Sequence, residues 1–410
     1  MKNLFTFTLI ACFGFLSCQN NDDPTPTPVD PANQVLKSAI AEQNNSFSMD
    51  IFREILANEE EQKNIFISPM SMYYALGMAG TGAANETRDE FNTLLGWQNQ
   101  ADTAILLAMK SLYSDISPAN NGITLEVANS LWQRESAPIK ETYKNLVAEY
   151  FDAQVSALDF ADPQSVDVIN NWIEEKTHDR IQDMLDAISP DAIMYLINAI
   201  YFKANWKYQF DKDENQEMTF TKADNEPITT TFMRQKGTFR FQKNEYCSAI
   251  SLPYTDSNYC MIGLLPNDTL GIDGLLEQLT LDNWKKWNNE MTYQEVELSL
   301  PKFKYVYGTK LINDELQALG LLKAFNADEA DFSNITDVQI FISRVMHKAF
   351  IEVNETGSEA AAATIVEFEW TSVGPEKPTF MANHPFIFAI YHQPSASILF
   401  IGKVACPVYE

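Results

Sequence analysis

The chain has 410 residues, enough to bury a large core, and its 45% hydrophobic and 12% aromatic content indicates a folded globular protein. It carries 29 Lys and Arg against 56 Asp and Glu, so its net charge is −27. Such an acidic protein is a poor partner for nucleic acid, whose phosphates need positive charge, and for direct adhesion to anionic lipid head groups.

The N-terminus predicts an export signal. Lys2 precedes an apolar run from Leu4 to Leu16, which is shorter than the ~20 residues of a membrane-spanning helix. The run ends in Phe-Leu-Ser-Cys at residues 15–18, which resembles a relaxed bacterial lipobox. We therefore expect residues 1–17 to be a lipoprotein signal peptide and Cys18 to carry acyl chains that anchor the protein. An ordinary signal peptide that happens to contain Cys18 is the alternative.

Residues 18–35 predict a disordered tether between the lipid and a folded domain of residues 36–410. The segment is polar and contains Pro-Thr-Pro-Thr-Pro at residues 24–28, so it cannot form a core. Asp22 and Asp23 follow the cysteine closely and resemble the surface-export signals of Bacteroidetes lipoproteins. We expect an outer-membrane lipoprotein that faces the cell surface or the extracellular space.

Helical patterns dominate the first part of the domain and strand patterns the later part. Apolar residues recur with a helical period in residues 47–56, 71–80, 86–95, 103–116 and 165–177. Strand patterns occupy residues 125–132, 194–202, 247–253, 259–265, 296–300, 386–391 and 397–404. This order predicts an α+β domain with large antiparallel sheets.

The sequence carries no recognisable catalytic or metal-binding motif. It lacks a G-x-S-x-G elbow, an H-E-x-x-H pair and a Walker loop, and none of its four histidines lies in an active-site motif. Beyond the N-terminal segment, Cys247, Cys260 and Cys406 have no C-x-x-C spacing. We expect no enzyme, no cofactor, no metal site and no disulfide framework. A cross-strand bond between Cys247 and Cys260, and a hydrolase with an unrecognised motif, are the alternatives.

Residues 355–371 separate into two faces when read with period two. One face is formed by Ser358, Ala360, Ala362, Thr364, Val366, Phe368 and Trp370. The other is formed by Glu359, Ala361, Ala363, Ile365, Glu367 and Glu369. The pattern predicts a strand with one buried side, which begins with small side chains. A short helix is the alternative, because alanine is the best helix former.

The beginning of this segment resembles the hinge of the reactive loop in an inhibitory serpin. The matching residues are Glu355, Gly357, Ser358, Glu359, Ala360, Ala361, Ala362 and Ala363. Further segments resemble serpin landmarks in the family's order, at residues 66–71, 198–206, 300–303, 316–320, 347–349, 383–388 and 400–404. The chain is therefore identified as a member of the serpin family. The resemblance implies a large antiparallel or mixed central sheet, two further sheets, about eight or nine helices and an exposed reactive loop near residues 355–380.

The resemblance also implies a function. A protease cleaves the reactive loop, and the hinge then inserts into the central sheet and traps the acyl-enzyme, which makes the serpin an irreversible suicide-substrate inhibitor. Ser68, Asn198 and His347 resemble the polar cluster that controls sheet opening, and Trp206 resembles the residue beneath the opening point. A non-inhibitory serpin that acts as a binding protein is the alternative.

The family's spacing from hinge to cleaved bond implies cleavage between Thr371 and Ser372, with Trp370, Val373 and Gly374 as alternative positions. No Lys or Arg occurs from Ser358 to Gly374. We therefore expect the target to be an elastase-like or chymotrypsin-like serine protease, or a papain-like cysteine protease, rather than a trypsin-like enzyme. We expect the inhibitor to be a monomer.

Overall fold

The computed structural model describes residues 31–117, 122–189, 192–358 and 377–409. Its α-helices are α1 (Pro31–Ala57), α2 (Pro69–Gly82), α3 (Asn85–Leu94), α4 (Asp102–Ile116), α5 (Glu141–Phe151), α6 (Gln164–Lys176), α7 (Gly271–Gln278), α8 (Leu281–Glu290) and α9 (Asn313–Ala318). Two 3₁₀ helices are η1 (Lys212–Glu214) and η2 (Lys323–Phe325).

The strands include every predicted strand that lies within the described residues, whereas most of the strand predicted for residues 355–371 lies outside them. The described strands are β1 (Ile65–Ile67), β2 (Ile123–Arg134), β3 (Gln154–Leu158), β4 (Met194–Asn205), β5 (Gln216–Thr221), β6 (Pro227–Lys243), β7 (Cys247–Pro253), β8 (Tyr259–Pro266), β9 (Thr292–Pro301), β10 (Phe303–Leu311), β11 (Met346–Val353), β12 (Gly357–Ser358), β13 (Thr379–Met381), β14 (Phe386–His392) and β15 (Ser397–Val404). The first helix begins earlier than predicted, so residues 31–35 of the expected tether are helical. Proline is favourable at a helix start because the missing N–H has no partner there.

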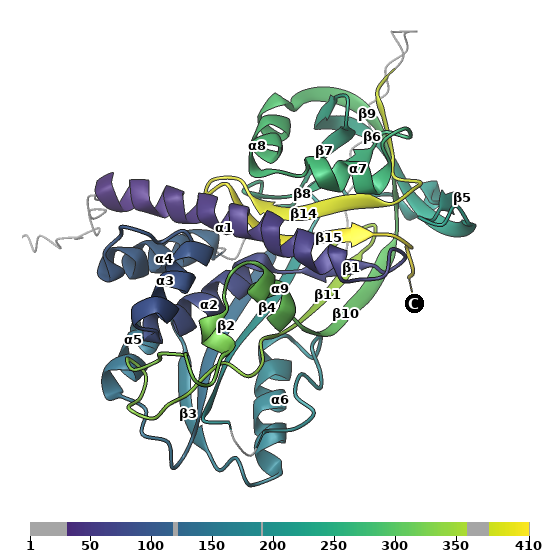
Figure 1. Cartoon of the computed structure of the whole chain (residues 1–410). Coiled ribbons are helices and arrows are strands. Elements are labelled where there is room, and N and C mark those ends of the chain that lie inside the picture. Colours follow the sequence, from purple (N-terminus) through teal and green to yellow (C-terminus); the bar gives the residue numbers. More distant parts are fainter. Residues whose placement is uncertain (1–30, 118–121, 190–191, 359–376, 410) are drawn as a thin grey trace, which may run out of the picture.

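A six-stranded sheet forms the long lower part of the molecule in Figure 1, in the order β10-β11-β12-β4-β2-β3. β2 and β3 run parallel, whereas the other neighbours are antiparallel. This sheet is the predicted large mixed sheet. Its fourth and fifth strands, β4 and β2, pair along most of their length.

The two further sheets that the sequence predicts are joined into one hydrogen-bonded network of nine strands. Its order is β1-β15-β14-β8-β7-β6-β9-β13, with β5 also paired to β6. The long strand β6 makes the connection, because residues 232–241 pair with β9 and residues 240–243 pair with β7. Every residue of β14 and β15 is buried, including the polar residues His392, Ser397 and Lys403.

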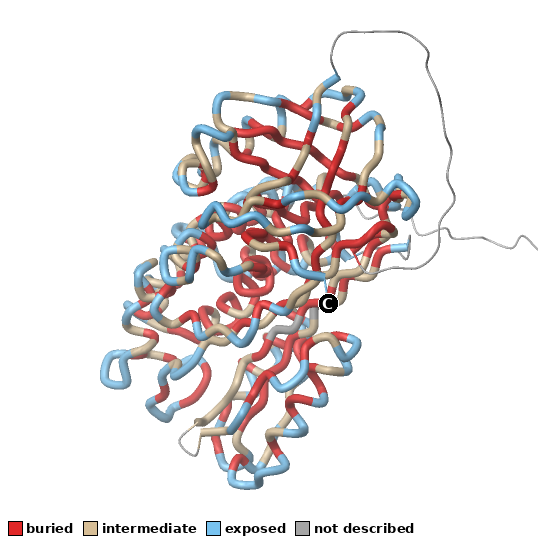
Figure 2. Tube along the Cα trace, turned by 90° about the vertical axis from the view of Figure 1, so that its right-hand side faces the viewer, coloured by how far each residue is buried: buried red, intermediate tan, exposed pale blue. Residues whose placement is uncertain are grey.

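Helix α2 lies in the main core between the two sheets and packs against both β4 and β15. Ser68 caps its first turn by accepting a hydrogen bond from the backbone N–H of Ser71. Twelve of its 14 residues are buried, which is the pattern of a helix that is surrounded by protein. The side view in Figure 2 shows the buried residues running through both layers.

A second, smaller hydrophobic cluster covers the other side of β2 and β4. Helix α6, at the bottom of Figure 1, contributes Trp172, and the segment that follows it contributes Leu185. They pack near Trp132 of β2 and Ile197 of β4. The six-stranded sheet is therefore covered on one side by the main core and on the other by a separate small cluster.

The cysteines of the described chain are free. Cys247 lies opposite Pro266 and Cys260 lies opposite Pro253, so the two thiols are at opposite ends of the β7–β8 hairpin. The alternative of a Cys247–Cys260 bond is therefore wrong. No described helix has both the length and the apolar character needed to cross a membrane. Within the described ranges, no three His, Cys, Asp or Glu side chains form a cluster that could hold a metal ion.

Gly402 offers a test of the packing between β15 and its neighbours. A Cβ atom at this position would lie 2.6 Å from the carbonyl oxygen of Ile65 and 2.7 Å from the ring of Phe388. We expect Gly402→Ala to cost about 1–3 kcal/mol and to lower the midpoint of thermal unfolding. Gly308→Ala is the control, because a Cβ there meets no atom within 4 Å. Equal midpoints for the two variants would contradict this packing.

Candidate functional site

The short strand β12 lies between β11 and β4. Gly357 and Ser358 pair with Asn205 and Ala204 of β4, and Ser358 also pairs with Val353 of β11. In the described part of the chain, no other strand register connects β11 to β4. Gly357 and Ser358 are thus the first residues of a strand position between β11 and β4 that further residues can extend.

Gly357 is required here by close packing. A Cβ atom on Gly357 would lie 2.1 Å from the carbonyl oxygen of Ala204 and 2.6 Å from the Cα atom of Asn205. Real side chains do not approach a backbone so closely, so any other residue would push β12 away from β4. The resemblance placed Gly357 in the hinge, and the structure shows in addition that no side chain fits at this position.

Ser358 is buried beneath the sheet surface, with 2% of its area exposed. Its hydroxyl is 2.9 Å from that of Tyr254, and the two groups form a hydrogen bond. The ring of Tyr254 stacks on that of Trp206, with centroids 4.7 Å apart and an interplanar angle of 6°. The face assigned to Ser358 from the sequence is therefore the buried face.

Hydrogen bonds with Trp206 and with the side chain of Asn354 hold the turn between β11 and β12. The indole N–H of Trp206 donates to the carbonyl oxygen of Asn354, and its backbone N–H donates to that of Thr356, both at 2.9 Å. The side-chain oxygen of Asn354 accepts from the N–H of Thr356 at 3.0 Å, from its hydroxyl at 2.8 Å and from the N–H of Gly357 at 3.3 Å. We call residues 354–356 the hinge turn. Trp206 packs against it, and its expected place beneath the opening point of the sheet stays a prediction.

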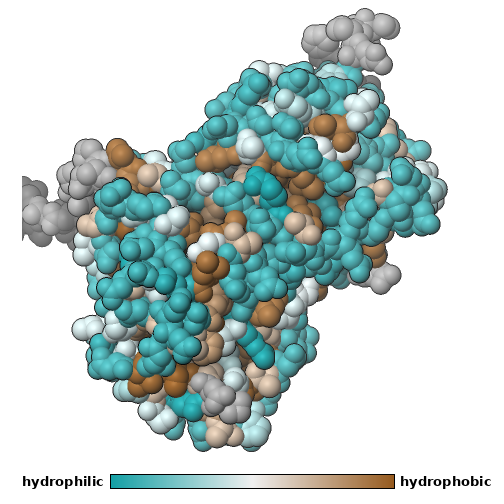
Figure 3. Space-filling view, viewed as in Figure 1, coloured by the Kyte–Doolittle hydropathy of each residue, from teal (hydrophilic) through white to brown (hydrophobic). Residues whose placement is uncertain are grey.

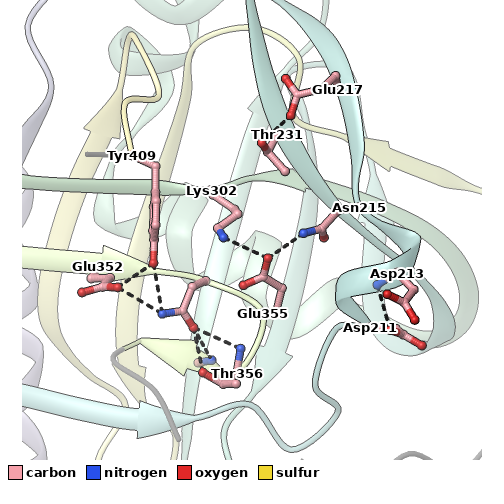
Figure 4. A network of polar contacts seen from close by, with 12 residues as sticks. Asp211, Asp213, Asn215, Glu217, Thr231, Lys302, Glu352, Glu355, Thr356 and Tyr409 are labelled. Atoms are coloured by element: carbon pink, nitrogen blue, oxygen red, sulfur yellow. Dashed lines mark hydrogen bonds and ion pairs between the residues drawn. The ribbon is translucent and has the colours of Figure 1, made fainter. Parts of the chain in front are cut away.

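Glu355 is buried at the tip of the hinge turn, with 3% of its area exposed. Figure 4 shows its carboxylate between Lys302, whose Nζ is 2.9 Å away, and Asn215, whose Nδ2 is 2.6 Å away. Burial alone would raise the pKa of Glu355, but the hydrogen bonds from Asn215 and Lys302 lower that pKa below its ordinary value. The carboxylate is therefore charged at neutral pH and ties the hinge turn to η1 and to the β9–β10 connection.

Ser68 and His347 also come together. The backbone N–H of Ser68 donates to Nε2 of His347 at 3.2 Å, and the Ser68 hydroxyl donates to the carbonyl oxygen of Leu399 at 2.8 Å. Both residues are buried, and His347 lies on β11. Asn198 lies on β4 opposite Asn129, and its side chain is outside the described part of the structure. A role of these residues in sheet opening stays a prediction.

Several predicted positions cannot be compared with the structure, because they lie outside the described residues. They are Cys18, Glu359, Ala360, Ala361, Ala362, Ala363, Trp370, Thr371, Ser372, Val373 and Gly374. Sequence reasoning missed four residues that contact the hinge, namely Tyr254, Asn215, Lys302 and Tyr409. Lys302 is part of a landmark segment at residues 300–303, which was the one available signal.

The comparisons with known proteins agree with this geometry. The family model described as serpin (serine protease inhibitor) matches residues 42–407. A serpin-like protein of Methanosarcina acetivorans is 34% identical over 92% of this chain and 90% of its own. The native structure of Tengpin, a thermophilic serpin, aligns with a TM-score of 0.82 and 30% identity over 93% of this chain and 96% of that chain.

A second similar structure is that of human thyroxine-binding globulin complexed with thyroxine. It aligns with a TM-score of 0.82 and 25% identity, and the alignment covers 91% of this chain and 100% of that chain. Similarity of this extent, together with a family model that matches most of the sequence, identifies the fold and the family. The chain belongs to the serpin family.

Proposed function

We propose that this serpin is an irreversible suicide-substrate inhibitor of proteases, which traps the acyl-enzyme by inserting its cleaved reactive loop between β4 and β11. Serpins are typically protease inhibitors rather than catalysts. The observation that carries the proposal is the position of β12, where Gly357 and Ser358 already pair with β4. Insertion would extend a strand whose first residues are in place, a form of strand addition for which serpins are themselves a standard case.

The register of β12 predicts where the following residues would go. Gly357 lies opposite Asn205 and Ser358 opposite Ala204, so continuing residue by residue would place Phe368 opposite Met194, the first residue of β4. On the other side, Ser358 lies opposite Val353, so continuation would place Thr364 opposite His347. The alternating segment is thus long enough to run along the whole of β4.

The side chains of this segment suit such an insertion. Ser358 points into the core, so residues of the same parity would also face the core, beginning with Ala360 and Ala362. Small side chains there would enter between packed strands with little rearrangement. The other parity carries Glu359, Glu367 and Glu369, which would face away from the core.

The free energy gained by insertion is large enough to drive the trap. About ten further residues would pair with β4, and each hydrogen bond contributes about 1 kcal/mol net, so the gain is of the order of 10 kcal/mol. Burial of Val366 and Phe368 would add about 1.5–3 kcal/mol each. The uncleaved state is therefore a kinetically trapped one.

We propose the Thr371–Ser372 bond as the cleaved bond, with the neighbouring bonds from Trp370 to Gly374 as alternatives. A segment without Lys or Arg favours an elastase-like, chymotrypsin-like or papain-like target. We further propose that residues 1–17 are removed and that Cys18 anchors a monomeric inhibitor to the outer membrane, facing outward. The space-filling view in Figure 3 shows a mainly hydrophilic face with small separate apolar areas, which suits an exported monomer.

The alternative is a non-inhibitory serpin that acts as a binding protein. The similarity to thyroxine-binding globulin favours considering it. The hinge argues for inhibition, because Ser358 is small and already inserted. Covalent capture of a protease separates the two functions.

Substitution of Ser358 tests the proposed loop insertion. We expect Ser358→Arg to convert the inhibitor into a substrate, because a charged side chain cannot replace a 2%-exposed serine on the core side of the sheet. The number of inhibitor molecules consumed per protease trapped should rise at least about tenfold, since an unpaired buried charge costs several kcal/mol. Ser358→Thr, which keeps the hydroxyl near Tyr254, should still trap. A covalent complex formed at wild-type yield by the arginine variant, seen on a denaturing gel, would refute the insertion model.

The thermal stability of the cleaved wild-type protein also tests the proposed insertion. Cleavage between residues 370 and 374 should raise the midpoint of thermal unfolding by roughly 10 °C or more, because insertion adds about 10 kcal/mol to the stability of the fold. The measurement is a melting curve before and after cleavage, with the bond located by mass spectrometry. An unchanged midpoint, with no protease captured from an elastase, chymotrypsin and papain panel, would exclude the proposed function.

The buried side chain of His347 makes the stability of the fold depend on pH. Burial lowers the pKa of His347 to about 3, whereas an unfolded histidine titrates near 6.5. The unfolded state therefore takes up a proton as the pH falls below about 6.5 while the folded state stays neutral, so stability is lost towards pH 3. At pH 5 the loss of folding stability is about 2 kcal/mol.

His347→Gln should show a smaller fall of the melting midpoint between pH 7.5 and 5. An equal pH slope for wild type and H347Q would contradict the prediction.

A further inference from the structure

The segment after β15, residues 405–409, lies against the hinge turn. The backbone N–H of Lys304 donates to the carbonyl oxygen of Val408 at 2.7 Å, which fixes the segment beside β10. The next residue is Tyr409, with 39% of its area exposed. Figure 4 shows its ring beside Lys302 and its hydroxyl directed at Glu352 and the hinge turn.

The hydroxyl of Tyr409 supports one side of the hinge turn. It donates to Oε1 of Glu352 at 2.6 Å and accepts a long hydrogen bond of 3.5 Å from the side-chain amide of Asn354. The same amide donates to Oε1 of Glu352 at 3.2 Å. These contacts fix the rotation of the Asn354 side chain, whose oxygen accepts the N–H groups of Thr356 and Gly357.

The ring of Tyr409 contacts a second group that holds the hinge turn, the ammonium group of Lys302. The ammonium group of Lys302 lies 4.4 Å from the ring centroid, a cation–π distance, and the same group forms the ion pair with Glu355. Lys302 is thus held between an aromatic face and a buried carboxylate. Tyr409 therefore contacts both groups that hold the hinge turn, Asn354 through its hydroxyl and Lys302 through its ring.

We propose that Tyr409 is a positioning residue for loop insertion, which latches the hinge turn so that insertion starts from a fixed register. Its role in trapping rests on the proposed function, whereas its effect on the hinge turn does not. Burial and the neighbouring Glu352 raise the pKa of Tyr409 to about 12, so the hydroxyl remains a donor at neutral pH.

The latch matters because trapping is a race between insertion and hydrolysis of the acyl-enzyme. A fixed hinge turn has already lost the conformational freedom that a loose turn would lose during insertion. A loosened turn would slow insertion, so more acyl-enzyme would be hydrolysed and more inhibitor would be consumed per protease trapped. Since Tyr409 is partly exposed, its loss should alter the hinge without destabilising the distant core.

The two contacts can be separated by substitution. Tyr409→Phe keeps the ring on Lys302 and removes the hydroxyl, whereas Tyr409→Leu removes both contacts. Val408→Ala is the matched control, since it shortens a neighbouring side chain that is 40% exposed and keeps the backbone bond from Lys304. The full chain is used for all variants.

The first readout is amide hydrogen exchange of a peptide that covers residues 354–358. We expect exchange to be roughly tenfold faster in Tyr409→Leu, intermediate in Tyr409→Phe and unchanged in Val408→Ala, since a local opening is governed by the few bonds that hold it. A peptide from β14 and β15 reports on the core and should not change. Unchanged hinge exchange in Tyr409→Leu overturns the latch, and so does faster exchange in both peptides, because that would show a general structural role.

The second readout is the number of inhibitor molecules consumed per protease trapped. We expect it to rise roughly twofold to fivefold in Tyr409→Leu, less in Tyr409→Phe and not in Val408→Ala, since the leucine variant loses both contacts and the phenylalanine variant only those of the hydroxyl. An unchanged ratio beside faster hinge exchange overturns the positioning role. If wild type captures no protease, the proposed function fails, and the exchange data alone decide whether Tyr409 latches the turn.

Discussion

The connection between β11 and β4 depends on a strand of two residues. Gly357 and Ser358 supply the registers that join these strands in the described chain, and the close approach of Gly357 to Ala204 leaves no room for a side chain. A sheet joined so briefly at its centre can accept additional backbone at low cost, because few hydrogen bonds must first be broken. The proposed inhibition depends on this short connection between β11 and β4, and the hinge turn lies beside it.

The groups that hold the hinge come from distant parts of the chain. Trp206 follows β4, while Tyr254 follows β7 of the nine-stranded sheet, and their stacked rings support Ser358 from below. Lys302, between β9 and β10, pairs with Glu355 from above. Buried ion pairs add little net stability compared with apolar packing, because the charges must be desolvated. The Glu355–Lys302 pair therefore contributes chiefly to where the hinge turn lies.

The sequence predicted those parts of the site that are local in the chain. The alternation after Glu355 indicated the buried parity of Ser358, the helical pattern of residues 71–80 indicated α2, and the strand patterns indicated β14 and β15. Tyr254 was not predicted, because its contact with Ser358 spans 104 positions and an aromatic residue in a hairpin turn has no distinctive pattern. The joining of the two expected sheets through β6 was not predicted, since the pairing of one strand with both β7 and β9 depends on contacts between residues far apart in the sequence.

The small second cluster covers the face of the six-stranded sheet that lies away from the main core, and it bears on the cost of separating β4 from β11. The segment after α6 crosses the sheet, where His178 contacts Glu126 of β2 and Tyr201 of β4, and the Lys348 ammonium of β11 donates to the carbonyl oxygen of Gln182. This segment packs in the small second cluster rather than in the main core. In the proposed insertion β4 moves away from β11, and the apolar contacts that would shift on this outer side belong to the small cluster, whereas the packing of α2 against β15 lies in the main core. The proposed insertion thus requires a local rearrangement of the sheet and of its outer cluster rather than global unfolding.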